Sequence, residues 1–101
     1  MRIAIASTSK EESSQVSPVG ARAEFYLIFE NKKLVKTIKN PFAVGGGGAG
    51  FAVTQMLANE KVNLVVCGRV GPNMQTALEA KGIKLKLIND KTVKETLKRI
   101  K

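Results

Sequence analysis

The sequence contains no histidine and only one cysteine, and these absences exclude several kinds of site. Without histidine there is no Ser-His-Asp triad, no Cys-His pair and no imidazole metal site. A single cysteine excludes an intrachain disulfide framework and is typical of a reducing compartment, so we expect a cytoplasmic protein. The eight acidic residues are scattered and form no carboxylate cluster for metal-dependent catalysis. We therefore predict a protein that is not an enzyme.

The sequence also lacks a long apolar run. No stretch approaches the roughly 18 apolar residues of a membrane span, so we expect no membrane insertion. The apolar start, Met1 to Ala6, is too short for the core of a signal peptide and is typical of a strand. With 101 residues and 44% hydrophobic content, the chain is expected to form one domain over residues 1–101.

Positive charge is what the sequence has in excess, with 17 basic residues against 8 acidic ones and a formal net charge of +9. Such an excess attracts phosphate groups, nucleic acids and anionic cofactors over long range. A lysine-rich solvated surface gives the same composition. Aromatic residues that could stack on bases are few, so a basic nucleic-acid-binding domain is an alternative function rather than the leading one.

Hydrophobic patterns predict a strand, a β-hairpin, and then alternating helices and strands. The strands are expected near residues 3–7, 24–30, 34–38, 63–67 and 83–87, and the helices begin near residues 49, 73 and 92. Asn73 is interpreted as the N-cap of the second helix, and Gly82 as the glycine that follows its end. Thr92 and Glu95 fit a capping box at the start of the third helix.

This order predicts an α/β fold with a mixed five-stranded sheet. The first three strands would be antiparallel, and the later strands would run parallel to the first with right-handed crossovers. The loops after the first, third and fourth strands then leave the sheet at the same end. Ligands bind at the carboxyl ends of strands in open α/β sheets, so we expect a binding site where these three loops meet.

The glycine-rich segment before the first helix is the main candidate for that site. Its backbone N–H groups and the helix N-terminus could bind an anion through Gly46, Gly47, Gly48 and Gly50. No Gly-Lys-Ser/Thr follows, so it is not a Walker loop, and its context does not fit a dinucleotide fingerprint. The alternative is a structural connector that lets the helix begin close to the sheet.

Three further residues are candidates at the same edge. Cys67 ends a buried strand, where its thiolate could ligate a metal and Arg69 could lower its pKa. A lone cysteine in an apolar run is also an ordinary small core residue, and both interpretations stay open. Arg22 ends the long loop of residues 8–23, at the predicted mouth of the site.

Several short motifs follow one another nearly from end to end of the chain: Met1–Ala6, Val16-Ser17-Pro18, Arg22-Ala23, Asn40-Pro41, Gly46–Gly50, Gly68–Asn73, Ala80–Lys84 and Thr92-Val93. In this order and spacing they resemble the iron–molybdenum cofactor biosynthesis family, the dinitrogenase accessory and cofactor-carrier proteins. The family commonly has His-Phe-Gly-Arg after Ser-Pro, whereas this chain has Val19, Gly20, Ala21 and Arg22. Some relatives carry a cysteine at the position of Val70.

The resemblance implies a three-layer α/β fold of ribonuclease-H-like topology and a non-catalytic binding module. Its ligand would be iron–molybdenum cofactor or an iron–sulfur precursor, which are anionic clusters, and its partners would be cofactor-biosynthesis or acceptor proteins. Because the family histidine is absent, the implied ligand site is degenerate and keeps anion contacts through Arg22, the glycine loop and Arg69. A scaffold or regulatory protein with a decayed site is a further alternative.

Overall fold

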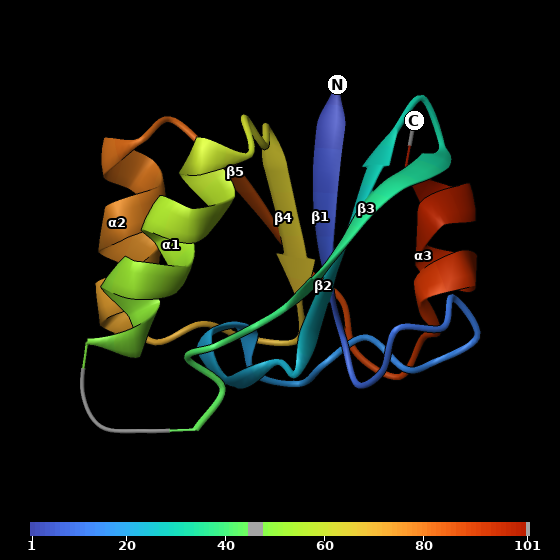
Figure 1. Cartoon of the computed structure of the whole chain (residues 1–101), viewed down its shortest axis with the longest axis horizontal. Coiled ribbons are helices and arrows are strands. Elements are labelled where there is room, and N and C mark those ends of the chain that lie inside the picture. Colours follow the sequence, from blue (N-terminus) through green and yellow to red (C-terminus); the bar gives the residue numbers. More distant parts are fainter. Residues whose placement is uncertain (45–47, 101) are drawn as a thin grey trace.

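The computed structural model describes residues 1–44 and 48–100, and its elements follow the predicted order (Figure 1). They are β1 (Arg2–Ser7), η1 (Gly20–Arg22), β2 (Phe25–Glu30), β3 (Lys33–Lys39), α1 (Ala49–Asn59), β4 (Leu64–Cys67), α2 (Pro72–Ala80), β5 (Lys84–Leu87) and α3 (Val93–Arg99). The 3-10 turn η1 lies in the long loop after β1, for which no regular element was predicted.

The five strands form one mixed sheet in the order β3-β2-β1-β4-β5. The pairs β1–β2 and β2–β3 are antiparallel, while β1–β4 and β4–β5 are parallel. In the β2–β3 turn, Asn31 and Lys32 have φ values of 51° and 66°, as a two-residue hairpin turn of type I′ requires. The predicted antiparallel meander followed by parallel strands is confirmed.

Helices cover both faces of the sheet, which gives three layers (Figure 1). Because side chains alternate along a strand, Ala4 and Ala6 face the core beneath α1 and α2, whereas Ile3 and Ile5 face the core beneath α3. The short alanine side chains leave room for Tyr26, which is fully buried on the α1–α2 side. The predicted three-layer architecture with ribonuclease-H-like topology is therefore confirmed.

The helix termini follow local sequence signals with one exception. At α3 the predicted capping box is present: the Thr92 hydroxyl accepts from the Glu95 N–H at 3.1 Å, and the Glu95 carboxylate accepts from the Thr92 N–H at 3.0 Å. Gly82 follows the end of α2 with φ 70°, as predicted. The prediction that Asn73 caps α2 is wrong: Gly71 is the N-cap, because Pro72 fits the first helical position, where no N–H donor is needed.

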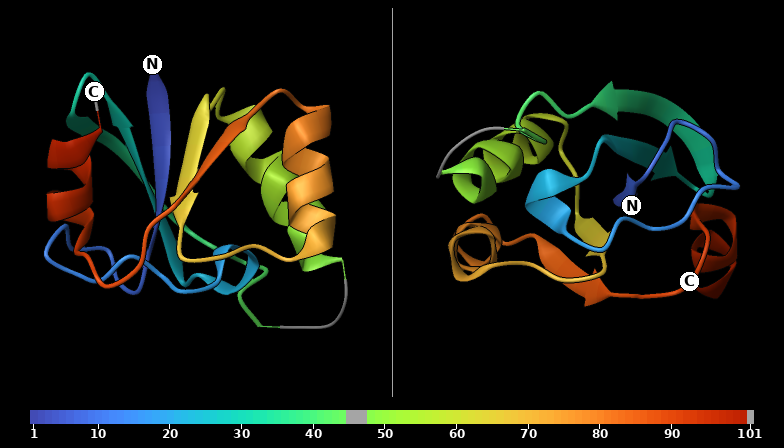
Figure 2. Two further views of the ribbon diagram at one scale, coloured as in Figure 1. Left: turned by 180° about the vertical axis from the view of Figure 1, so that it is seen from behind. Right: turned by 90° about the horizontal axis from the view of Figure 1, so that it is seen from below.

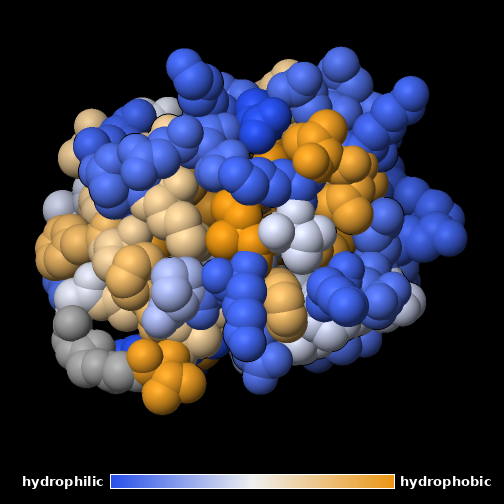
Figure 3. All heavy atoms as spheres, viewed as in Figure 1, coloured by the Kyte–Doolittle hydropathy of each residue, from blue (hydrophilic) through white to orange (hydrophobic). Residues whose placement is uncertain are grey.

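Both edge strands carry several lysines: β5 alternates them with leucines, and β3 has lysines at positions 33, 36 and 39. β3 leaves Leu34 and Val35 41% and 49% exposed, and Figure 3 shows apolar side chains near the middle of the face that β3 crosses. Lysines on edge strands discourage pairing with another chain. Among the described residues, no helix combines the length and the apolar character that crossing a bilayer requires.

Candidate functional site

A pocket of about 260 Å³ opens where the loops after β1, β3 and β4 meet. Figure 1 shows η1 and the first turns of α1 and α2 together at the lower end of the molecule, and Figure 2 shows the same end from below. The pocket is lined by Val19, Ala21, Arg22, Gly48, Ala49, Gly50, Gly71, Pro72, Asn73 and Met74. We call it the helix-start pocket. The predicted convergence of three loops on one edge of the sheet is confirmed.

Hydrogen bonds hold the long first loop against the ends of β1 and β4. The Ser17 N–H donates to Ala6 O at 2.8 Å, and the Gly68 N–H donates to Ser17 O at 2.9 Å. Further along, the Gly20 N–H donates to Arg69 O at 2.9 Å. Gly68 has no room for a side chain, because a Cβ there would lie 2.7 Å from the Pro18 backbone. The wall of the pocket that carries Arg22 is therefore a fixed part of the fold.

Asn40 joins this wall to the segment after β3. Its side-chain amide donates to Ala23 O at 2.9 Å and to Ala21 O at 3.2 Å, and its carbonyl oxygen accepts from the Phe42 N–H at 2.9 Å. The residue is only 4% exposed. From the sequence, Asn40-Pro41 is predicted only as the end of a strand, because Ala21 and Ala23, which accept hydrogen bonds from the Asn40 amide, are remote in sequence. The available signal for a structural role was the polar Asn40 beside a proline and a short apolar stretch.

Two helix N-termini open into the helix-start pocket. Gly48 is the N-cap of α1 and Gly71 is the N-cap of α2. Within residues 1–44 and 48–100, no side chain caps either helix, in contrast to Thr92 at α3. The N–H groups of a first helical turn have no partner inside the helix, and each N-terminus carries about half a positive charge. Both features favour an anion in this pocket.

The two helix starts can approach each other because Gly50 has no side chain. A Cβ at this position would lie 2.8 Å from the backbone nitrogen of Met74 and 3.1 Å from its Cα. Gly50 is therefore required by the packing of α1 against α2, and it brings the first turns of both helices to the same pocket. This contact joins two helices, so it does not decide between the two predicted roles of the glycine segment, anion binding and a connector that lets α1 begin close to the sheet.

Arg22 places its side chain at the mouth, as predicted. The residue is exposed, and its Nη1 donates to Phe42 O at 3.3 Å, which links η1 to the segment that leads to α1. Arg22 also lines a neighbouring pocket of about 240 Å³ together with Glu24 and Pro18. No carboxylate is present among the described residues that line the helix-start pocket itself. Arg22 is thus its one charged lining residue in the described structure.

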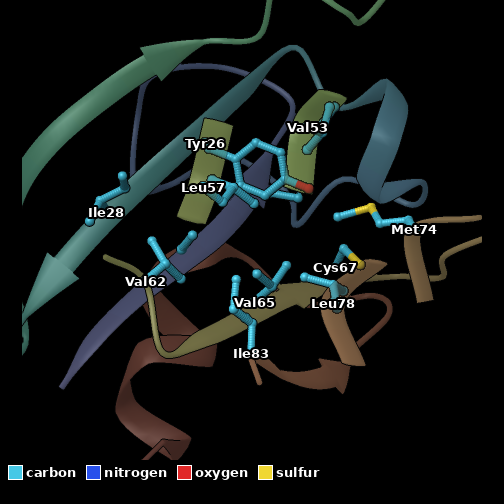
Figure 4. Close-up of a cluster of buried hydrophobic side chains, with 13 residues drawn as sticks. Tyr26, Ile28, Val53, Leu57, Val62, Val65, Cys67, Met74, Leu78 and Ile83 are labelled. Atoms are coloured by element: carbon cyan, nitrogen blue, oxygen red, sulfur yellow. The ribbon is translucent and has the colours of Figure 1, made fainter. Parts of the chain in front are cut away.

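Cys67 lies beneath this pocket and not in its wall. The residue is fully buried, and Figure 4 shows it beside Met74 and Leu78 in the core under α1 and α2. Gly20 covers the thiol, since a Cβ on Gly20 would lie 3.0 Å from the Cys67 sulfur. Burial raises the pKa of Cys67 to about 12, and smaller opposite effects come from the backbone groups of Gly20 and Arg69. The thiol therefore keeps its proton at neutral pH.

Of the other predicted site residues, some line the helix-start pocket and others do not. Gly48 and Gly50 line the helix-start pocket with Arg22, whereas Gly46 and Gly47 lie outside the described residues. Arg69 is exposed and contributes its backbone carbonyl to the Gly20 N–H, but it is not among the residues that line the pocket. In the described part of the chain, no three histidine, cysteine, aspartate or glutamate side chains come together as a metal site.

The family model described as dinitrogenase iron-molybdenum cofactor matches the chain over residues 1–101. The chain belongs to this family. The resemblance inferred from the short motifs is therefore confirmed. No curated protein sequence matches the chain.

Two solved structures resemble this member of the family over nearly its whole length. The orange protein of Desulfovibrio gigas, solved in its apo form, has a TM-score of 0.90 and 27% identity, with 97% of this chain and 84% of that chain covered. A Thermotoga protein described as a candidate NifB protein, solved by NMR, has a TM-score of 0.83 and 34% identity, with 96% and 84% covered. The fold of the dinitrogenase cofactor family thus extends over both chains.

Proposed function

We propose that this protein is a non-catalytic carrier that binds an anionic metal–sulfur cofactor as cargo in the helix-start pocket. The cargo class is iron–molybdenum cofactor or an iron–sulfur precursor of it. Membership of the dinitrogenase cofactor family supports this class of cargo. Proteins that make the cofactor or accept it would be the partners, and a cytoplasmic location would suit such an exchange.

The observation that carries the proposal is the convergence of two uncapped helix N-termini and one guanidinium group on a pocket that no described carboxylate lines. Backbone N–H groups and arginine side chains bind anions through charge-assisted hydrogen bonds. A fixed pocket loses little conformational freedom when the ligand binds. Its volume of about 260 Å³ lies just below the lower end of the usual range for small-molecule sites, which is about 300 Å³.

The proposed binding is electrostatic and uses no resident metal ligand in the wall. Val19 occupies the position where the family commonly has histidine, and it lines the pocket with an apolar side chain. Cys67, the predicted metal ligand, lies below the wall with its proton retained. Cargo held by hydrogen bonds and charge can be released without breaking a metal–ligand bond, which suits a protein that must pass it on.

An anaerobic titration with isolated iron–molybdenum cofactor tests the proposal. We expect saturable changes in visible absorption near one equivalent per chain, and comigration of metal with protein on gel filtration. Arg22→Gln should weaken binding about tenfold, the effect of losing one charge-assisted contact. The matched control is Arg69→Gln, which removes the same charge outside the pocket and should have a much smaller effect. Absence of saturation, or equal loss in both variants, would overturn the proposed site.

A further inference from the structure

A second concave surface lies on the α3 side of the sheet. It is an open groove of about 690 Å³, lined by Lys86, Ile88, Asn89, Lys91, Lys98 and Arg99. We call it the basic groove. It shares no lining residue with the helix-start pocket among the residues described. Figure 2 (left) shows the chain passing from β5 across to α3, and this connection forms part of the groove.

The register of the sheet explains why the groove is there. Lys86 of β5 lies directly beside Val66 of β4, and neighbours in a parallel pair point to the same face. Val66 belongs to the core under α3, so Lys86 is placed on the α3 side. α3 packs against β1, which is the third strand from the β5 edge of the sheet. The surface between α3 and β5 is left open as a result.

The floor of the basic groove is held in place by the core. The Ile88 N–H donates to Cys67 O at 2.9 Å, and the Ile88 side chain packs against the apolar cluster under α3. The Asn89 side chain donates to Gly68 O at 3.2 Å. Lys98 and Arg99 stand in the last turn of α3. The four cations are therefore arranged around an aliphatic floor by regular structure and by a pinned loop.

The side chains that line the basic groove favour an acidic peptide over a single-stranded nucleic acid. Three lysines and one arginine line the groove, and none of its described lining residues is acidic. Carboxylates and phosphates would both be attracted. Single-stranded nucleic acid binds by stacking its bases on aromatic side chains, and the lining contains none. An aliphatic floor fits an apolar side chain, which a peptide can supply between acidic residues.

We propose that the basic groove docks an acidic segment of a partner protein, with carboxylates on Lys86, Lys91, Lys98 and Arg99 and an apolar side chain on Ile88. The groove and the helix-start pocket have separate linings, so a partner can engage the groove while the pocket stays accessible. The docking does not depend on what the pocket holds, and either proposal can fail without the other.

The probe for this groove is a short fluorescein-labelled peptide of Glu-Glu-Leu repeats, followed by fluorescence anisotropy. We expect saturable binding that weakens steeply with added salt. Replacing the four cations together (Lys86→Gln, Lys91→Gln, Lys98→Gln and Arg99→Gln) should weaken it at least about tenfold, since each exposed pair contributes modestly. Replacing every leucine of the peptide by serine should also weaken it, because the contact with Ile88 is lost.

The matched control carries the same change in net charge at exposed lysines outside the groove: Lys10→Gln, Lys32→Gln, Lys33→Gln and Lys39→Gln. It should bind the peptide nearly as well as the unmodified protein. The double variant Lys98→Gln/Arg99→Gln gives a second reading if the fourfold variant folds poorly. Equal loss in groove and control variants would overturn the proposal, and so would tighter, groove-dependent binding of a single-stranded oligonucleotide.

Discussion

Gly50 of α1 and Met74 of α2 meet through their backbones, and a methyl group on Gly50 would lie 2.8 Å from the Met74 nitrogen. Real Cβ atoms do not approach other atoms this closely, so Gly50→Ala must push the two helix starts apart. We expect a loss of about 1–3 kcal/mol in unfolding free energy, as for other overpacked sites. Cargo binding should fall as well, because the two N-termini would no longer face one pocket. Urea unfolding and the cofactor titration measure the two effects.

Gly71→Ala is the control for that substitution. A Cβ on Gly71 meets no described atom within 4 Å, and its φ of −79° suits any residue. We expect a loss below about 1 kcal/mol, the usual range for a poor N-cap. If Gly50→Ala proves as stable as Gly71→Ala, the backbone contact does not position the helices.

An aspartate in place of Gly71 separates helix stability from anion binding. A side chain there has open space, and N-cap aspartate accepts hydrogen bonds from the first N–H groups of a helix. Gly71→Asp should therefore keep the unfolding free energy unchanged or raise it by about 0.3 kcal/mol, because glycine is itself an acceptable N-cap. The same carboxylate would occupy the N–H groups that the cargo needs and would repel an anion. Cofactor binding should drop more than tenfold, and unchanged binding would show that α2 does not hold the cargo.

The sequence was sufficient to predict which loops form the site, but not which side chains in those loops contact one another. Alternation of isoleucine and alanine in β1 and the two-residue turn at Asn31-Lys32 were enough to orient the strands. Strand direction then placed the three loops at one edge, because the carboxyl ends of β1, β3 and β4 share it. Local patterns carry this information since they depend only on which face of an element is buried.

The sequence could not predict which candidate residues are exposed in the pocket and which are buried beneath it. Cys67 and Arg22 both belong to loops or strand ends at the same edge, yet Gly20 lies over the thiol while the guanidinium reaches the mouth. That difference depends on a contact between segments nearly 50 residues apart, roughly the separation of Gly20 and Cys67, which no local pattern encodes. The N-cap of α2 was misplaced for a local reason, because Asn73 and Gly71 are both acceptable caps.

The burial of Cys67 predicts a fall in stability at alkaline pH. The unfolded thiol loses its proton above about pH 8.5. The folded thiol, with a pKa of about 12, keeps its proton. Between these values the unfolded state binds fewer protons, so unfolding becomes easier as pH rises, by up to about 1.4 kcal/mol per pH unit. Burial also raises the pKa of Tyr26, which adds a loss of the same sign above about pH 10.

Cys67→Ala isolates the contribution of the thiol. Urea unfolding at about pH 8 and about pH 10 should show a smaller drop in stability for this variant than for the unmodified protein. The folded protein should also react slowly with a thiol reagent until it unfolds. We expect cofactor binding to persist in Cys67→Ala. Its loss, with the fold intact, would establish Cys67 as the metal ligand that the sequence predicted.

Two buried threonines give a stability prediction of opposite sign. The Thr96 hydroxyl in α3 is buried and has no hydrogen-bond partner among the described atoms, whereas the Thr54 hydroxyl in α1 donates to Gly50 O at 2.8 Å. Replacing an unsatisfied buried hydroxyl by a methyl group removes a desolvation cost of about 1–3 kcal/mol. Thr96→Val should therefore raise the unfolding free energy by about 1 kcal/mol, and Thr54→Val should lower it by about 0.5–1.5 kcal/mol. Both substitutions replace a hydroxyl by a methyl group, so the change in side-chain shape is the same. If thermal unfolding shows melting temperatures shifted in the same direction, the Thr96 hydroxyl is not unsatisfied or the Thr54 hydrogen bond does not stabilise the fold.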